Sequence, residues 1–80
     1  MEIQAGSIVY SKAGRDKTKK LLVLAVEGEY AYVADGAQRV VEKPKKKKLK
    51  HLQMTNQVFA IDKDKLSNSD IRKILENPNK

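Results

Sequence analysis

The sequence predicts a mostly β protein, in which a small antiparallel β-barrel is followed by a short C-terminal α-helix. The first fifty or so residues hold four or five short apolar segments separated by tight turns, which is typical of such a barrel. Apolar residues at helical spacing occur near the C-terminus. The length of 80 residues allows one domain with a compact core. We therefore expect the barrel over residues 1–54 and a C-terminal extension over residues 55–80, with a helix at about 68–77.

The first three strands can be placed from apolar runs and turn residues. Gly6–Lys12 is expected to be a strand, and Ala13–Lys17 a polar turn. Leu21–Val26 is a continuous apolar run, too short for a typical helix and rich enough in valine to favour a buried strand. The turn Glu27–Glu29 then leads into the return strand Tyr30–Ala34. Alternation along that strand places its two tyrosines on one face of the sheet.

The next segments predict a hairpin and the closure of the barrel. Asp35-Gly36 suits a type I′ turn, so Arg39–Glu42 is expected to be a strand that Pro44 ends. Lys45–Lys48 is expected to be a solvated charged loop, flexible when free and ordered on a bound polyanion. Leu49–Met54 is expected to be the last strand. Closing the barrel would remove exposed strand edges.

The C-terminal helix is predicted from its cap. Ser67 and Asp70 have the spacing of a capping box, with Ser67 as the N-cap residue. Leu66 and Ile71 fit the accompanying hydrophobic staple, and Pro78 would end the helix. The expected apolar face consists of Ile71, Ile74 and Leu75. A helix this short requires packing against the barrel or a partner.

The charge is concentrated in the first two thirds of the chain. The formal net charge is +7, and residues 1–53 hold 12 Lys+Arg against 6 Asp+Glu. Residues 54–80 hold 5 against 4. Such a concentration favours a polyanionic partner, either nucleic acid or an anionic membrane surface, over a merely soluble surface. The sequence has no apolar run of the roughly 20 residues that span a bilayer.

The sequence contains no pattern for catalysis, a metal or a cofactor. There is no cysteine, and His51 is the single histidine, expected on the surface of the last strand. Glu27 and Glu29 flank a turn glycine, where we expect solvated carboxylates. We therefore expect a protein that is not an enzyme and has no small-molecule substrate. Its N-terminus lacks the order of a signal peptide, so we expect a cytoplasmic protein.

Two basic segments are the candidate binding residues. The first surrounds the first turn and consists of Lys12, Arg15, Lys17, Lys19 and Lys20. The second consists of Lys43, Lys45, Lys46, Lys47, Lys48 and Lys50. The first and last strands of a small closed barrel can lie close together, which would merge the two segments into one surface. Ten of these eleven cations are lysines, which predicts recognition of a backbone and its shape over sequence reading.

A few other residues are candidates for specific contacts. Arg15 can grip a phosphate at two points, and Arg39 is a second such candidate. His51 is a candidate for a phosphate or base contact. The three tyrosines, Tyr10, Tyr30 and Tyr32, have two interpretations: they stack on bases or they cover the core.

These residues resemble a known family. The stretch from Gly6 to Lys17 followed by an apolar strand is similar to a KOW motif, and Tyr32–Gly36, Arg39 and Leu49–Thr55 follow in the same order. The chain resembles the KOW-containing large-subunit ribosomal proteins of archaea and eukaryotes (the "fourteen-e" group), and more closely their short bacterial relatives. The resemblance covers roughly residues 4–56. Where many KOW motifs have glycines after the first turn, this chain has Thr18 and Leu21.

The resemblance implies an SH3-like barrel, binding to ribosomal RNA and a role in translation. It places the RNA contacts on the turn Lys12–Lys20 and on the lysine-rich stretch. The alternative function is a protein-interaction module, because KOW domains of transcription elongation factors use the same barrel to dock proteins. Ribosomal or transcription proteins are then candidate partners beside RNA.

Overall fold

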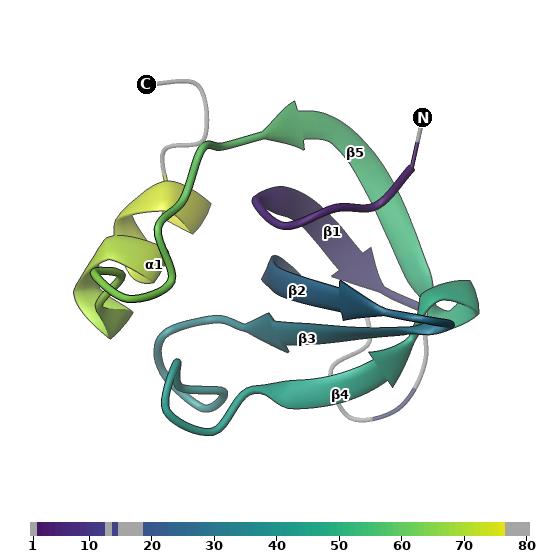
Figure 1. The fold of residues 1–80 in the computed structure, drawn as a ribbon, viewed down its shortest axis with the longest axis horizontal. Helices are drawn as coiled ribbons and strands as arrows, with labels where there is room; N and C mark the ends of the chain where they lie inside the picture. The colour runs from purple at the N-terminus through teal and green to yellow at the C-terminus, as the bar shows by residue number, and fades with distance from the viewer. Residues whose placement is uncertain (1, 13, 15–18, 77–80) are drawn as a thin grey trace.

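The computed structural model describes residues 2–12, 14 and 19–76. Within these residues the chain forms five strands in one antiparallel sheet, followed by one α-helix (Figure 1). The elements are β1 (Ser7–Ser11), β2 (Lys20–Glu27), β3 (Tyr30–Ala34), β4 (Lys45–Lys48), a 3₁₀ turn (Leu49–His51), β5 (Leu52–Val58) and α1 (Asn68–Glu76). The prediction of a mostly β fold with a C-terminal helix is confirmed.

The sheet has the strand order β4-β3-β2-β1-β5, and every neighbouring pair is antiparallel. It curls into a barrel-like shape, but within the described residues β4 and β5 form its two edges and do not pair. They are joined by the 3₁₀ turn, from which they diverge (Figure 1). The expected full closure is therefore wrong: the turn redirects the chain away from β4 instead of laying β5 along it.

The apolar run in β2 is buried on both faces of the sheet. Leu21 and Val23 face one core, and Leu22 and Leu24 face the other, because side chains alternate along a strand. The first core lies inside the curled sheet and consists of Val9, Leu21, Val23, Ala31, Val33 and Leu52. The second lies on the opposite face and consists of Ile8, Leu22, Leu24, Ala34 and Ile71. Continuous apolar runs are typical of strands with both faces covered.

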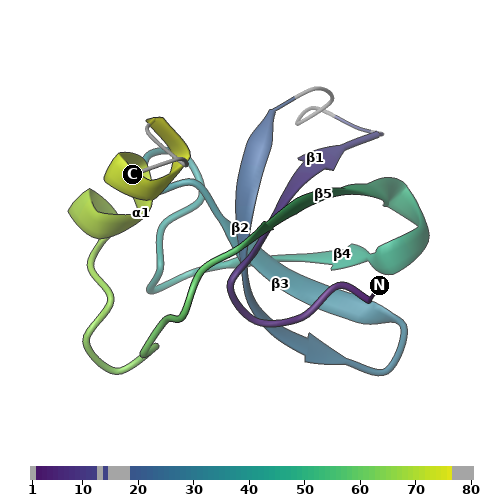
Figure 2. The ribbon, with the colours of Figure 1, turned by 90° about the horizontal axis from the view of Figure 1, so that it is seen from above.

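The helix α1 covers the second core. Its Ile71 is fully buried, and Ile74 and Leu75 pack around it, which confirms the predicted apolar face. The segment between β5 and α1 adds Phe59, Ile61 and Leu66 to the same core. Figure 2 shows the helix on one side of the sheet, next to β2. Burial of one such aliphatic side chain stabilises the fold by about 1.5–3 kcal/mol.

The predicted capping box begins α1. The backbone N–H of Asp70 donates to Ser67 Oγ, and the backbone N–H of Ser67 donates to Asp70 Oδ2, both over 3.1 Å. These bonds satisfy donors that a helix start otherwise leaves without partners. They also lower the pKa of the Asp70 carboxyl, chiefly through the Ser67 backbone N–H. Pro78, the predicted helix stop, lies outside the described residues.

The segment between β3 and β4 is a loop, so the predicted strand over Arg39–Glu42 is wrong. Asp35 Oδ1 accepts hydrogen bonds from the backbone N–H groups of Ala37 and Arg39, both over 2.8 Å. A side chain that binds nearby N–H groups competes with a strand ladder for the same donors. The loop is fastened to α1, because Val41 N donates to Asn68 Oδ1 over 2.7 Å and Arg72 Nη1 donates to the Gly36 oxygen.

The lysine run is itself a strand. Lys45–Lys48 forms β4 and pairs with β3 at four positions, so the expected flexible loop is wrong. Pro44 precedes this strand and does not end one. The expected last strand, Leu49–Met54, begins instead as the 3₁₀ turn, and β5 continues to Val58. Lysine has a low β-propensity, so the strand is stabilised by its pairing with β3.

Two turn glycines with positive φ give a first test of this packing. Gly36 has φ +80°, and a Cβ there would collide with the Asn68 oxygen and lie 2.9 Å from Arg72 Cγ. Gly28 has φ +59° with open space around it. We expect Gly28→Ala to lower the free energy of unfolding by about 1 kcal/mol through backbone strain alone. Gly36→Ala should cost about 2–4 kcal/mol, because overpacking is added to the strain. Urea unfolding would measure both, and equal losses would contradict the packing of α1 on the loop.

The capping box predicts a pH dependence of stability. Folding lowers the pKa of Asp70 from its ordinary value of 3.8, so the unfolded chain binds the proton more readily. The stabilisation is therefore complete above that value and is lost as the pH falls through the lower folded pKa. We expect Asp70→Asn to lower stability at pH 7 and to flatten the loss between pH 7 and pH 3. Urea unfolding at both pH values checks this, with the exposed Asp64→Asn as the control. An unchanged acid loss in Asp70→Asn would contradict it.

Candidate nucleic-acid interface

Lys12 of the first basic segment lies beside the second basic segment at the end of β1. Lys47 Nζ donates to Ser11 Oγ over 3.0 Å, and the backbone N–H of Lys12 donates to the His51 oxygen over 2.7 Å. A Cβ on Gly14 would lie 3.7 Å from Lys47 Nζ, so Gly14 also comes close to this lysine. Lys12, Lys50 and His51 are exposed there. The predicted contacts Arg15 and Lys17 lie outside the described residues.

Alternation along β4 divides its four lysines between two faces. Lys45 and Lys47 stand opposite Val33 and Ala31, on the face of the first core. Lys47 is half-buried there, whereas Lys45 stays exposed. The other two lysines stand opposite tyrosines, with Lys48 across from Tyr30 and Lys46 across from Tyr32. The run is therefore not one continuous patch, because a strand turns successive side chains to opposite sides.

The outward face of β3 and β4 combines cations with aromatic rings, and we call Tyr30, Tyr32, Lys46 and Lys48 the tyrosine–lysine face. Both tyrosines are half-buried and both lysines are exposed. Lys46 Nζ lies 4.5 Å from the centroid of the Tyr30 ring, a cation–π distance. The Tyr32 hydroxyl donates to Glu27 Oε1 over 3.5 Å. Tyr30 and Tyr32 thus lie on the one face that strand alternation predicts.

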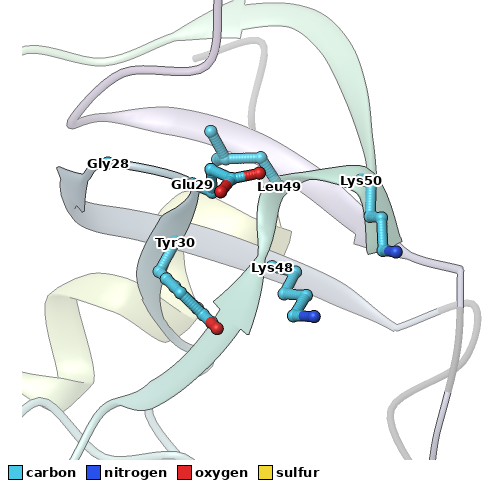
Figure 3. A pocket seen from close by; sticks show the side chains of 6 residues that line it. All are labelled: Gly28, Glu29, Tyr30, Lys48, Leu49 and Lys50. Carbon is cyan, nitrogen blue, oxygen red and sulfur yellow. The ribbon is translucent and has the colours of Figure 1, made fainter.

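A pocket of about 360 Å³ adjoins this face (Figure 3). It lies between the turn that joins β2 to β3 and the 3₁₀ turn, and its lining consists of Gly28, Glu29, Tyr30, Lys48, Leu49 and Lys50. The backbone N–H of Leu49 donates to the backbone oxygen of Glu29 over 2.8 Å, which ties the two turns together. Sequence reasoning treated Glu29 as a solvated turn residue and did not place it beside Lys48 and Lys50. Pro44 directly before the lysine run is the sequence feature that could have marked β4 as a strand.

Other predicted binding residues are held by contacts within the protein. Lys20 Nζ donates to the Leu75 oxygen in the last turn of α1 over 3.4 Å. Lys19 Nζ donates to Gln38 Oε1. Arg39 is half-buried in the loop between β3 and β4, where its oxygen accepts the N–H groups of Asp35 and Gly36. This loop and the 3₁₀ turn lie at opposite ends of β4. Arg39 is therefore not on the same surface as Lys50 and His51.

The position of His51 differs from the prediction of a strand residue. It ends the 3₁₀ turn, is exposed and follows Lys50. In the part of the chain that the structure describes, no group of three or more His, Cys, Asp or Glu side chains could hold a metal ion. Nor does the helix found in that part have the length and apolar character to cross a bilayer. The groups exposed around His51 are those of Lys12 and Lys50.

Comparisons with known proteins add no relative. No model of a protein family matches the chain, and no curated protein gives a significant match.

The contact between Lys20 and α1 gives this lysine a structural role. A cation near a helix C-terminus stabilises the helix by about 0.3–1 kcal/mol. We expect Lys20→Met to lower the free energy of unfolding by about that amount, and Lys50→Met, at an exposed residue, to leave it unchanged. Urea unfolding of both variants would measure the difference. Equal stability of the two variants would contradict a structural role for Lys20.

Proposed function

We propose that this protein is a non-catalytic RNA-binding protein that recognises structured RNA through phosphate contacts, with a role in translation in the cytoplasm. The tyrosine–lysine face carries the proposal. There, two exposed lysines flank two half-exposed tyrosines at a sheet edge, and Lys50 adjoins them in the 3₁₀ turn. Cations bind phosphates, and aromatic rings stack on unpaired bases. A surface that joins both is suited to RNA.

Binding to such a surface is driven by counterion release. Each lysine that neutralises a phosphate frees condensed cations, so the affinity falls steeply as the salt concentration rises. Lysine is a flexible point charge without the planar fork of arginine, and it therefore favours contacts to the RNA backbone over base reading. The resemblance to KOW-containing ribosomal proteins supports ribosomal RNA as the target, since those proteins combine a small barrel with basic segments. It also supports the role in translation.

A protein-interaction module is the second candidate function. One observation favours it: a groove of about 710 Å³ is lined by the apolar residues Ile3, Val26, Leu49 and Met54 together with the polar residues Glu2 and Gln4. The helix does not favour it, because Ile71 of its apolar face is fully buried in the second core and Ile74 and Leu75 already pack against that core. A partner protein would therefore have to bind the groove and not the helix. In that case the lysines of β4 would be accessory to binding.

A charge-reversal experiment separates the two functions. The variant carries Lys46→Glu, Lys48→Glu and Lys50→Glu. Its matched control carries Lys63→Glu, Lys65→Glu and Lys73→Glu, which change the net charge equally at exposed sites elsewhere. With a labelled hairpin RNA, wild-type affinity should fall roughly 100-fold between 50 and 200 mM salt if about four phosphates are contacted. At 50 mM salt the first variant should bind the RNA at least roughly 100-fold more weakly than the wild type does. The control variant should lose far less RNA affinity.

Three outcomes decide the matter. Equal losses in the two variants would mean that net charge alone, and not the tyrosine–lysine face, drives the binding. A wild-type protein that binds no hairpin RNA at any salt concentration would contradict the RNA function. If the wild-type protein binds no RNA and the first variant still binds its cellular protein partners, the protein-interaction module is favoured.

A further inference from the structure

We propose that the pocket between the β2–β3 turn and the 3₁₀ turn holds one unpaired guanine nucleotide of the bound RNA. This inference rests on the proposed function and deepens it, because it adds base selection to a surface whose lysines contact only phosphates. Four of its lining residues carry the groups that matter here: two ammonium groups, an aromatic ring and a carboxylate, on Lys48, Lys50, Tyr30 and Glu29. Each of these groups matches one part of a nucleotide.

The pocket is formed before any ligand binds. The 2.8 Å hydrogen bond from Leu49 N to the backbone oxygen of Glu29 fixes the two turns against each other and leaves the carboxylate out of this contact. Tyr30 and Lys48 are direct cross-strand partners, so the β3–β4 ladder sets their spacing. The volume of about 360 Å³ is near the lower end of the roughly 300–1,000 Å³ of small-molecule sites. It has room for one nucleotide and not for a stack of bases.

The lysines define the phosphate end of the pocket. The side chains of Lys48 and Lys50 extend to the right in Figure 3, away from the Glu29 carboxylate, and both residues are exposed. The Glu29 carboxylate lies apart from them, beside Leu49 (Figure 3). A carboxylate repels a phosphate and two ammonium groups attract one. A nucleotide is therefore oriented with its phosphate at the lysines and its base toward Glu29.

The Tyr30 ring provides the surface on which the base stacks. Tyr30 lines the pocket and is half-buried, so part of the residue stays accessible. Lys46 Nζ lies over one face of the ring, 4.5 Å from its centroid, and Lys46 does not line the pocket, so a base that stacks on Tyr30 would occupy the other face. Stacking on an aromatic ring tolerates every base, because every base has a π-face. Selection among bases must therefore come from Glu29.

The Glu29 carboxylate selects a base by its donors. It offers two oxygens that only accept hydrogen bonds, and it is filled best by two adjacent N–H donors. The Watson–Crick edge of guanine presents two such donors, the ring N1–H and the exocyclic N2 amino group. Adenine and cytosine present one amino group beside an acceptor, and uracil presents one N–H between two acceptors. The geometry therefore points to guanine.

The test uses four hairpin RNAs that share one stem and differ in a single unpaired loop nucleotide. Wild-type protein should bind the guanine hairpin about tenfold more tightly than the other three, measured by fluorescence anisotropy. Glu29→Gln should abolish this preference, because an amide offers one acceptor beside a donor. Tyr30→Ala should weaken binding to all four hairpins about tenfold through loss of stacking, whereas Tyr30→Phe keeps the ring and should bind as wild type does.

Matched controls and competitors make the outcome decisive. Glu76→Gln removes an exposed carboxylate at the end of α1 and should keep the guanine preference. Free GMP should compete for the site better than CMP, which would show that the nucleotide itself is recognised and not the stem. Circular dichroism would establish that each variant is folded, and Tyr30→Phe keeps the stacking step testable if Tyr30→Ala is not.

Two results would overturn the inference. One is equal wild-type affinity for the four hairpins, and the other is a guanine preference that Glu29→Gln leaves unchanged. In both cases lysine-dependent, salt-sensitive binding to every hairpin would leave the proposed function intact. If the wild-type protein binds none of the four hairpins, the proposed function itself is contradicted.

Discussion

Burial of β2 on both faces is the constraint on which the rest of this structure depends. The run from Leu21 to Leu24 sends alternate side chains into two cores, and a single curled sheet can cover one of them. The other face of β2 needs a separate cover, and α1 provides it through Ile71. The C-terminal segment is thus part of the fold, because without it Leu22 and Leu24 would be exposed to water. The same packing leaves α1 little apolar surface for a partner.

The cover also organises the loop between β3 and β4. Asn68 accepts a hydrogen bond from Val41 N and donates one to Glu42 Oε1, so the start of α1 is fastened to that loop. The Asn68 amide is the main cause of the lowered pKa of Glu42. Since this loop leads directly into β4, the helix is linked to the strand that carries the lysines. The second core and the candidate interface are therefore parts of one framework.

The lysines of β4 have two physical roles. Within the described residues β4 is an edge strand of the sheet, the position at which another chain can add by pairing, and lysine side chains oppose such pairing. The same charges attract a polyanion, and on the tyrosine side they lie beside aromatic rings. These roles are compatible, since bound RNA would cover side chains without adding a strand. The open edge thus explains why lysine is tolerated in a strand, and the neighbouring tyrosines support a binding role for it.

The sequence alone was enough to locate β1, β2, β3 and α1, because their signs are local: apolar runs, turn glycines, and a capping box between Ser67 and Asp70. Only the tertiary structure decided that Lys45–Lys48 is a strand, because lysine has little tendency to form one and β3 imposes it by pairing. It likewise decided that Lys20 serves α1 and that Glu29 shares a pocket with Lys48. Such relations join residues far apart in the chain, and short-range patterns contain no information about them.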